Sequence, residues 1–303
     1  MLTVTFLGTG AACPSVDRNV SGLAVAREGE TMLFDCGEGT QRQMMRYGVG
    51  FAFREIYFSH YHADHMLGVT GLMRTMGLQD RTAPVTLFGP RGAERVLGAA
   101  LSLGVERSKF PVEIVEVQPG DVLERGEYAL HVFPTEHRVD TIGWALVEHD
   151  RLGRFDPARA AELGVPEGPL WGRIHKGQNV ELPDGRTVTP AELVGPARPG
   201  RRLVYSGDTR PAAALVEVAR GADLLVHEAT FGDDERVRAK ETGHSTASEA
   251  ARVARDAGVR QLVLTHISQR YTRDAPELLA EARAIFPEVR IARDGMIVDV
   301  PYV

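Results

Sequence analysis

The chain has 303 residues, of which 43% are hydrophobic and 25% are charged, as in a globular protein with ample material for a core. Its formal net charge of −6 at pH 7 argues against a surface coated in nucleic acid. Cys13 and Cys36 are the only cysteines, so neither a disulfide framework nor a thiolate zinc site is expected.

The apolar pattern predicts two series of strands that feed helices. The first series predicts strands at 2–7, 22–27, 31–36, 54–59, 85–89, 112–117 and 128–134, with a helix at 65–76. The C-terminal third predicts strands at 202–207, 222–229, 261–266 and near 290–299, with helices at 246–257 and 276–285. This repeated alternation favours an α/β sandwich over an all-β protein.

The segment 151–200 differs from both series, because it carries seven Pro and eight Gly and has no clear periodicity. From Arg151 to Arg202 there are nine Lys and Arg against six Asp and Glu, a local charge of +3. A surface insertion or partly disordered linker is one interpretation. A projecting arm that handles a large substrate is the other.

The N-terminal sequence MLTVTFLGTG contains no basic leader, and no apolar run reaches the length of a membrane span. We therefore expect a cytoplasmic protein that has no membrane partner.

Residues 59–65 read SHYHADH, which places three histidines and one aspartate in six consecutive positions. An α-helix cannot aim them at one point, because at about 100° per residue His60 and His62 would point roughly 160° apart. A strand would align positions 60, 62 and 64 but turn His65 away. The side chains converge only if a strand ends near His60 and a turn follows, which is the geometry of a metal-binding loop.

Other metal-capable residues also lie at the ends of predicted strands. Because the carboxyl ends of strands in layered α/β folds meet at one rim, these residues can join the SHYHADH loop. The candidate ligands are then His60, His62, Asp64, His65, His137, Asp208 and His266. Five histidines and two aspartates are too many for one tetrahedral zinc, and they suit two Zn²⁺ or Mn²⁺ ions about 3.5–4 Å apart.

A single histidine is most often a surface or satisfied core residue, and we interpret His131, His149 and His175 in this way. The cluster is different, because four such residues in six positions would leave a core badly unsatisfied.

On these residues the chain resembles the metallo-β-lactamase superfamily, whose HxHxDH motif appears as His60, His62, Asp64 and His65. Within it, the chain resembles the ribonuclease Z family of tRNA 3′-processing endonucleases over nearly its whole length. The matching segments, in family order, are FLGTGAACPS, RNVSG, LFDCGEGTQRQ, FSHYHADH, SGDT, HEATF, GHST and HISQRY. HEAT followed by HST is more specific than HxHxDH, which lactamases, thioesterases and lactonases share.

The resemblance implies a four-layer αββα metallo-β-lactamase sandwich with a protruding flexible arm, built as a single domain 1–303 into which the arm 151–200 is inserted. It implies two Zn²⁺ per subunit, with Asp208 bridging them. His60, His62 and His137 would hold one ion, and Asp64, His65 and His266 the other. It also implies that Glu228 and His244 act as a pair near the leaving group. A buried carboxylate without a kinetic role is the alternative for Glu228.

The resemblance further implies a homodimer in which one subunit's arm grips the precursor tRNA that the other subunit cleaves. Gly168 and Pro169 correspond to the family's GP pair in the arm. The expected substrate contacts are Arg18, Asn19, Gly168, Pro169, Arg173, Lys176, Ser268, Arg270 and Tyr271, although a structural role suits the last three equally well. The family's PxKxRN loop reads PSVDRN here, with Val16 at the basic position, so the exact cleavage position is not predicted.

Cleavage of RNA through its own 2′-hydroxyl needs no metal, so the ligand set favours attack by water, which leaves 3′-hydroxyl and 5′-phosphate ends. Zinc lowers the pKa of a bound water from 15.7 to about 7, which is worth about 12 kcal/mol. Asp64 can accept the proton, and His244, held by Glu228, can protonate the departing 3′-oxygen. We therefore predict a zinc-dependent endoribonuclease that removes 3′ trailers from precursor tRNA. The alternatives are a hydrolase of small phosphodiesters or thioesters with the same fold, and a non-catalytic RNA-binding zinc protein.

Overall fold

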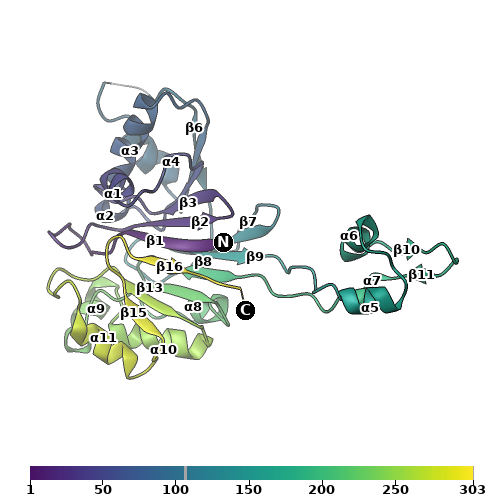
Figure 1. Cartoon of the computed structure of the whole chain (residues 1–303). Helices are drawn as coiled ribbons and strands as arrows, with labels where there is room; N and C mark the ends of the chain where they lie inside the picture. Colours follow the sequence, from purple (N-terminus) through teal and green to yellow (C-terminus); the bar gives the residue numbers. More distant parts are fainter. Residues whose placement is uncertain (106–107, 303) are drawn as a thin grey trace. The chain divides into compact units, whose positions relative to one another are not determined.

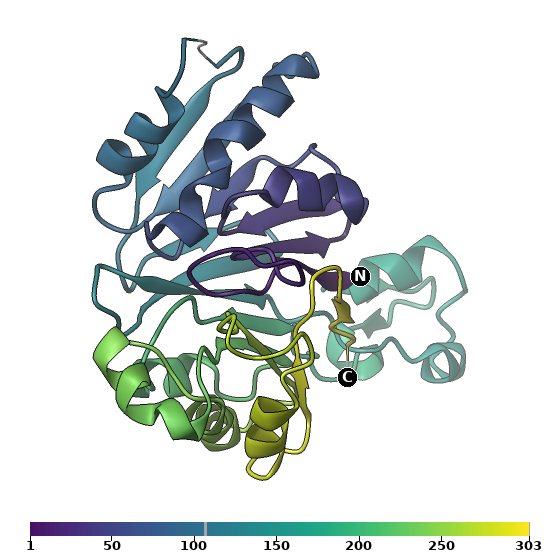
Figure 2. The same ribbon diagram turned by 90° about the vertical axis from the view of Figure 1, so that its left-hand side faces the viewer.

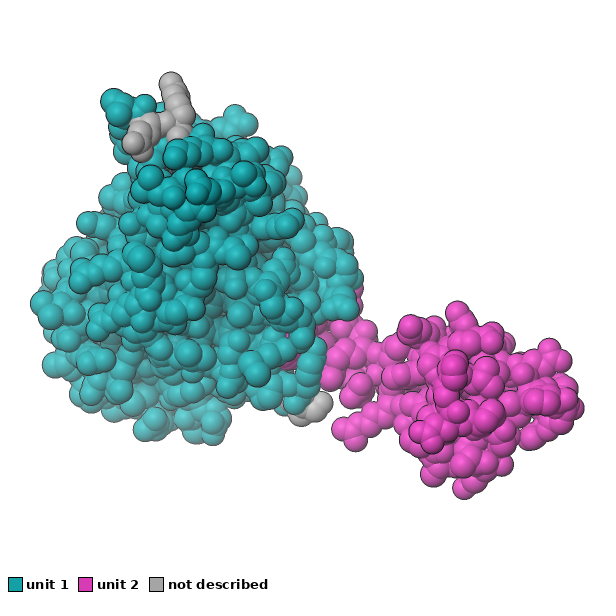
Figure 3. Space-filling view, turned by 45° about the horizontal axis from the view of Figure 1, so that its top comes forward, with its two compact units in different colours: residues 1–147, 202–303 teal, residues 148–201 magenta. Residues whose placement is uncertain are grey.

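The computed structural model describes residues 1–105 and 108–302, and the chain divides into two compact units. Unit 1 comprises residues 1–147 and 202–303, and unit 2 comprises residues 148–201 (Figure 3). None of the helices in the described residues is long and apolar enough to cross a membrane.

The first sheet of unit 1 has the strand order β16-β1-β2-β3-β4-β5-β6. Strands β3 to β6 run parallel, whereas β16, β1, β2 and β3 pair antiparallel. The strands are β1 (Leu2–Gly8), β2 (Gly22–Arg27), β3 (Glu30–Phe34), β4 (Glu55–Tyr57), β5 (Val85–Gly89), β6 (Val112–Glu116) and β16 (Ile297–Asp299).

The second sheet has the strand order β15-β14-β13-β12-β9-β8-β7, and strands β12 to β15 run parallel. Of these strands, β13 and β14 are buried along their length, as expected for parallel strands that are covered on both faces. The strands are β7 (Val122–Glu124), β8 (Tyr128–Pro134), β9 (Ile142–Glu148), β12 (Arg202–Tyr205), β13 (Leu224–Glu228), β14 (Leu262–Thr265) and β15 (Val289–Ile291).

Helices cover the outer face of each sheet, so unit 1 has four layers in the order α, β, β, α (Figures 1 and 2). The predicted α/β sandwich is therefore confirmed. The first helical layer contains α1 (Thr40–Arg46), α2 (Ala63–Met66), α3 (Gly68–Leu78) and α4 (Ala93–Leu101). The second contains α8 (Ala213–Val218), the 3-10 turn η1 (Asp233–Glu235), α9 (Arg236–Thr242), α10 (Ala247–Ala257) and α11 (Pro276–Arg283).

Three apolar cores hold these layers together. The central core between the sheets contains stacked aromatic rings, including Tyr57, which packs against Phe34, Phe88 and Trp144 with ring centroids 5.0–5.2 Å apart. The outer cores lie between each sheet and its helices. Rigid layers on both sides therefore fix the loops at the sheet ends, which carry the candidate ligands.

Two predicted elements differ from the observed ones near the SHYHADH loop. The predicted helix 65–76 is two helices, α2 and α3, with Leu67 between them. The predicted strand 54–59 is only β4, which ends at Tyr57. The early end of β4 gives the chain the turn that the histidines require.

Unit 2 has its own small apolar core, so it is not a structureless linker. Its elements are α5 (Pro157–Glu162), α6 (Pro169–His175), β10 (Val180–Glu181), β11 (Thr187–Val188) and α7 (Pro190–Leu193). Residues such as Ala160, Ile174 and Leu193 are fully buried among the helices and the β10–β11 hairpin. The core is formed by isolated apolar residues on short elements, which leave little periodicity in the sequence.

Candidate dinuclear metal centre

All seven predicted ligands lie together at one rim of unit 1, where strands from both sheets end. His60 follows β4, His137 follows β8, Asp208 follows β12 and His266 follows β14 directly. Asp64 and His65 belong to α2, which begins after His62. Positions more than 200 residues apart in the sequence thus meet, since Nε2 of His65 and Nε2 of His266 are 3.3 Å apart.

The first group consists of His60, His62, His137 and Asp208. Nδ1 of His62 lies 3.0 Å from Nε2 of His60 and 3.3 Å from Nε2 of His137. Oδ2 of Asp208 lies 3.6 Å from His60 and 4.0 Å from His137.

The second group consists of Asp64, His65 and His266, and it also meets Asp208. Oδ2 of Asp64 lies 3.2 Å from His266 and 3.6 Å from His65. Oδ1 of Asp208 lies 3.4 Å from each of these two histidines. Asp208 therefore turns one carboxylate oxygen to each group, as a bridging ligand does.

These spacings fit zinc coordination. Four ligand atoms held tetrahedrally at 2.0–2.1 Å from an ion lie about 3.3–3.4 Å from one another. The pairs of ligand atoms given above lie 3.0–4.0 Å apart, and all ligand atoms of each group lie within 4.8 Å of one another. Each group could therefore hold one cation with little movement.

The hydrogen bonds of the Nδ1 atoms show which nitrogen of each histidine ring faces the centre. Nδ1 of His65 bonds to Asp35 at 2.8 Å, and Nδ1 of His137 bonds to the carbonyl of Gly243 at 2.7 Å. Nδ1 of His60 meets Oγ of Ser59 at 3.0 Å, and Nδ1 of His266 meets Oγ1 of Thr230 at 2.8 Å. Both hydroxyls also donate to carboxylates, at Asp35 and Glu228, so each accepts from its histidine.

Each of these four Nδ1 atoms thus carries a proton, and Nε2 of each ring points at the centre, where it can offer a lone pair to a metal. In the described residues, Oδ1 of Asp208 is buried without a hydrogen-bond donor. Convergent lone pairs and an unpartnered carboxylate oxygen repel one another unless a cation lies between them. The donor set therefore fits a pair of metal ions.

The electrostatics favour the ligand states at His60, His137 and Asp208 and oppose the ligand state at His65. Burial lowers the pKa of His60 and of His137, which keeps these rings neutral. Burial would raise the pKa of Asp208, but His266 and His65 outweigh it and hold this pKa well below its usual range. Burial would lower the pKa of His65, but Asp208, Asp35 and Asp64 outweigh it and raise this pKa, so a proton competes with a metal there.

The buried Glu228 and the partly exposed His244 form a pair beside the centre. Oε1 of Glu228 accepts from Nδ1 of His244 at 2.9 Å and from the backbone N–H of Thr209 at 3.1 Å. Oε2 accepts from the backbone and the hydroxyl of Thr230. Burial would lower the pKa of His244, but Glu228 outweighs it and raises this pKa to about 9. The ring is therefore protonated at neutral pH and lies 3.9 Å from Asp208.

Arg210 connects the segments that carry these groups, and we did not predict it. Its guanidinium donates to the carbonyl of His244 at 2.5 Å and forms two bonds with Glu249, at 2.6 and 2.7 Å. Its backbone N–H donates to the carbonyl of Glu136, beside His137. Glu249 also forms the capping box of α10 with Thr246. Arg210 thus ties the loop of Asp208 to the turn of His244.

Asp35 is a second residue that we did not predict. Its buried carboxylate accepts from the backbone and hydroxyl of Ser59, from His65 and from the hydroxyl of Tyr205. Its position directly after the buried strand β3 was the signal that could have identified it, because other site residues share that placement.

The predicted substrate contacts in unit 1 lie in different environments. Arg18 is buried, and its guanidinium donates to Thr9, Ala292 and Arg273, so it anchors its loop and is closed to phosphate. Ser268 is buried, and the hydroxyl of Tyr271 accepts from the N–H of Gly232. Asn19 is half-buried, and Arg270 is exposed, 3.4 Å from Glu235.

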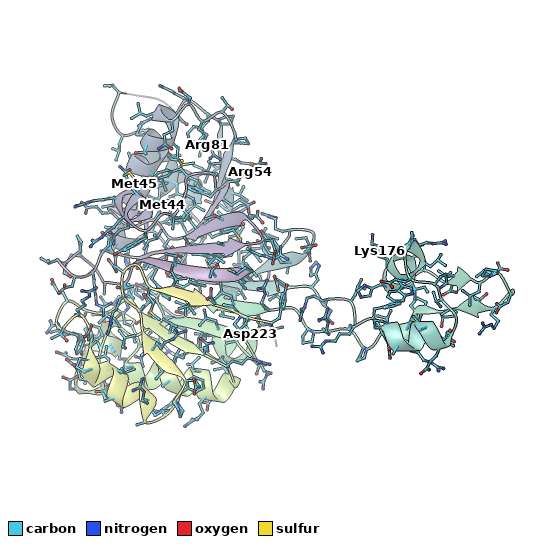
Figure 4. The ribbon with its side chains drawn as sticks, viewed as in Figure 1. Met44, Met45, Arg54, Arg81, Lys176 and Asp223 are labelled. Atoms are coloured by element: carbon cyan, nitrogen blue, oxygen red, sulfur yellow. The ribbon has the colours of Figure 1, made fainter. Side chains whose placement is uncertain are left out.

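The predicted contacts in unit 2 lie at the start and along the length of α6. Gly168 adopts φ +138° and ψ −147°, a conformation that disfavours residues with side chains, and Pro169 begins the helix. Arg173 and Lys176 are exposed, and Lys176 lies at the end of the helix (Figure 4).

Comparisons with known proteins agree with this architecture. A family profile described as a beta-lactamase superfamily domain matches residues 170–267, and one described as anti-Pycsar protein Apyc1 matches residues 2–151. The metallo-β-lactamase fold protein YhfI of Bacillus subtilis superposes with a TM-score of 0.71 at 20% identity, covering 98% of both chains. The fold and the rim site thus define a protein of the metallo-β-lactamase superfamily.

Curated relatives identify the branch. The chain is 55% identical to a ribonuclease Z of Gemmatimonas aurantiaca, over 99% of this chain and 96% of that protein. It is also 55% identical to a ribonuclease Z of Myxococcus xanthus, over 99% and 98%. The short form of human tRNase Z superposes with a TM-score of 0.71 at 28% identity, covering 99% of both chains. The chain belongs to the ribonuclease Z family.

Proposed function

We propose that this protein is an endoribonuclease that removes the 3′ trailer from precursor tRNA. The supporting observation is that full-length identity of 55% to curated ribonuclease Z proteins coincides with an intact rim site. All seven metal-capable residues and the Glu228–His244 pair are present and in contact. The products are a tRNA with a 3′-hydroxyl and a trailer with a 5′-phosphate.

The donor set favours two Zn²⁺ ions per subunit, with Mn²⁺ as the alternative, because five imidazoles suit these ions better than Mg²⁺. When bound, the two ions supply Lewis acidity, which lowers the pKa of a water from 15.7 to about 7 and offsets charge on the phosphate. One ion would be held by His60, His62 and His137. The other ion would be held by Asp64, His65 and His266, and Asp208 would contact both.

Asp64 orients the attacking water and takes its proton. Its Oδ2 accepts the backbone N–H of Ala12 at 2.7 Å and faces His266, which leaves Oδ1 for the water. Burial would raise the pKa of Asp64, but His65 and His266 outweigh it and keep the pKa below its usual range. The carboxylate is therefore ionised when substrate binds.

His244 supplies a proton to the departing 3′-oxygen, which is otherwise a poor leaving group. Nδ1 of the ring is held by Glu228, so the proton on Nε2 is the one delivered. The raised pKa keeps that proton in place at neutral pH.

Unit 2 binds the body of the precursor tRNA through phosphate contacts. Its seven exposed or half-buried Lys and Arg side chains are Arg151, Arg154, Arg159, Arg173, Lys176, Arg186 and Arg198. A folded tRNA is read by shape and backbone, so a basic module need not contact the bases. In the proposed homodimer, each subunit's unit 2 serves the partner's metal centre, and the activity resides in the cytoplasm. Light scattering should give twice the chain mass of 33.1 kDa, and one chain mass would remove the dimer from the proposal.

One experiment tests the activity and the acid together. The purified protein is incubated with a precursor tRNA that lacks an encoded CCA and with one that contains it, and both product ends are mapped. We expect a single internal cut with a 3′-hydroxyl on the tRNA. His244→Asn should slow this cut by about 10²–10⁴-fold and spare bis(p-nitrophenyl) phosphate, whose leaving group needs no acid. Absence of any cut in either precursor would overturn the proposal.

A further inference from the structure

Two adjoining hollows lie on unit 1 beside the loop 11–19. The first, of about 470 Å³, is lined by residues of α11 and of the segment 290–296. The second, of about 500 Å³, is lined by residues of the loop and of α1. Arg273 and Asp294 line both, so the two hollows share a wall, and we call them together the depression. Each is large enough for a small-molecule ligand or a nucleotide.

The walls of this depression carry a net positive charge, whereas the whole chain carries a net negative charge. Six arginines and four carboxylates line it, a net charge of +2 in a protein of net −6. Two of the carboxylates are engaged, because Asp274 pairs with Arg293 at 3.1 Å and Asp294 accepts from Thr9, Asn19 and Gln43. Asp17 and Glu38 are the other two. An anionic ligand is therefore favoured.

Four of the six arginines have no acidic partner for their charge. Within the described residues, the guanidinium groups of Arg42, Arg46, Arg273 and Arg283 form no ion pair or hydrogen bond, and all four side chains are exposed. By contrast, the guanidinium of Arg210 donates two hydrogen bonds to the carboxylate of Glu249. Free guanidinium groups are suited to phosphate oxygens, which they bind with paired N–H donors. We call these four residues the arginine groove.

The groove also offers apolar surface. Leu279, Ile291 and Met296 line the first hollow between the arginines. Single-stranded RNA presents both phosphates and unstacked bases, and the bases pack on apolar side chains and guanidinium planes. A duplex stem would present its phosphates and sugars and keep its bases stacked. The mixed lining therefore favours a single strand.

One loop connects the groove to the metal centre. At its start, the backbone N–H of Ala12 donates to Oδ2 of Asp64 at 2.7 Å. At its end, the backbone N–H of Asn19 donates to Oδ2 of Asp294 at 2.6 Å, in the shared wall of the hollows. The guanidinium of Arg18 fixes the loop to the carbonyl of Arg273 at 2.6 Å. A metal ligand and the groove are thus joined by eight residues that hydrogen bonds hold at both ends.

We propose that the arginine groove binds the single-stranded 3′ trailer of the substrate, on the product side of the scissile phosphate. This inference rests on the proposed function and adds the position of the second product. Trailers long enough to reach the groove place phosphates against its guanidinium groups, whereas the shortest trailers do not. The site size of single-strand grooves, about 4–16 nucleotides, sets the expected range.

The test measures KM for precursor tRNAs with trailers of about one, four and eight nucleotides. In the wild-type protein we expect KM to fall as the trailer lengthens. The fourfold variant Arg42→Ala, Arg46→Ala, Arg273→Ala, Arg283→Ala should raise KM for the longest trailer about tenfold, with the one-nucleotide substrate and kcat unchanged. The salt dependence of the KM should weaken by about 0.7 in log–log slope for each phosphate that the variant no longer binds.

Two further variants separate charge from structure. Replacing the same four residues by Lys keeps the positive charges and should restore most of the length dependence. The control, Arg91→Ala with Arg252→Ala, removes exposed charges elsewhere on unit 1 and should behave as the wild type.

A binding measurement keeps this inference separate from the proposed function. Fluorescence anisotropy with a 5′-phosphorylated RNA octamer should show weaker binding to the fourfold alanine variant, whether or not precursor tRNA is cleaved. If the octamer binds wild type and variant equally, or if KM is independent of trailer length in a protein that does cleave, the groove does not bind the trailer.

Discussion

The metal-centre rim and unit 2 show opposite ways of presenting polar side chains. At the rim, His60, His65 and Asp208 are buried, and neighbouring groups fix the orientation of each ring. In unit 2, the basic side chains lie on the outside of a small core, and Arg173 and Lys176 are exposed. Hydrolysis needs atoms held within tenths of an ångström, whereas phosphate binding needs only charge within reach.

Together with the proposed function, this difference predicts that chemistry and tRNA affinity reside in separable parts of the chain. Changes at the rim should damage hydrolysis of every substrate, whereas changes in unit 2 should damage only that of tRNA. Paired measurements on precursor tRNA and on bis(p-nitrophenyl) phosphate test this separation.

The largest effect is expected at the bridging carboxylate. Asp208→Ala removes the residue that meets both ligand groups, so we expect both activities to fall by on the order of 10³–10⁴-fold and bound metal to fall below two ions per chain. Metal analysis and kinetics on the two substrates check this. Asp256→Ala, at an exposed carboxylate, is the control. Retention of two ions and of activity would remove Asp208 from the centre.

Replacing unit 2 should separate the two activities. Arg151 and Arg198 pair as antiparallel neighbours, so an Asn-Gly turn in place of residues 153–196 can close the gap. We expect cleavage of precursor tRNA to fall at least about 10²-fold, because the shortened chain no longer binds the tRNA phosphates, and the small diester to be hydrolysed within about twofold of the wild-type rate. Equal survival of both activities would contradict the role of unit 2.

The pH profile tests the Glu228–His244 pair within the rim. A general acid must be protonated, and Glu228 raises the pKa of His244 to about 9, so kcat for precursor tRNA should fall as pH rises through that value. Glu228→Gln removes the negative charge beside His244, while burial still lowers the pKa of His244. The alkaline limb of the kcat profile should therefore move to lower pH by at least about one pH unit. Bound cations shift the pKa of His244 in the same direction in the wild type and in the variant. The measured quantity is therefore the difference between the alkaline limbs of the two proteins. An unchanged limb would assign Glu228 a structural role only.

The smallest effect is expected at Arg210, which touches no reacting group. Arg210→Met should lower kcat for precursor tRNA about tenfold through a looser His244 turn, leave KM unchanged and spare the activated diester. Glu249→Gln should have the same pattern, and the double variant should be no worse than the more severe single variant. Additive effects of the two changes would mean that the residues act separately.

The sequence predicted the site better than it predicted the supporting hydrogen bonds. The sequence identified His60, His62, Asp64 and His65 because no regular element could aim them together. It identified Asp208 and His266 because each follows a buried strand. Those arguments use only local geometry. The role of Arg18 was not predictable in this way, because a charged side chain does not reveal that Thr9, Ala292 and Arg273 surround it. The partners of Arg210 also depend on tertiary packing.

The meeting of His266 with the first histidine cluster has a consequence for synthesis of the protein. The second ligand group requires a side chain from the last part of the chain to pack against one from its first quarter. A nascent or prematurely terminated polypeptide that lacks the strand before His266 therefore cannot assemble this site. Under the proposed function, an unfinished chain is therefore expected to lack nuclease activity until its final segment has folded.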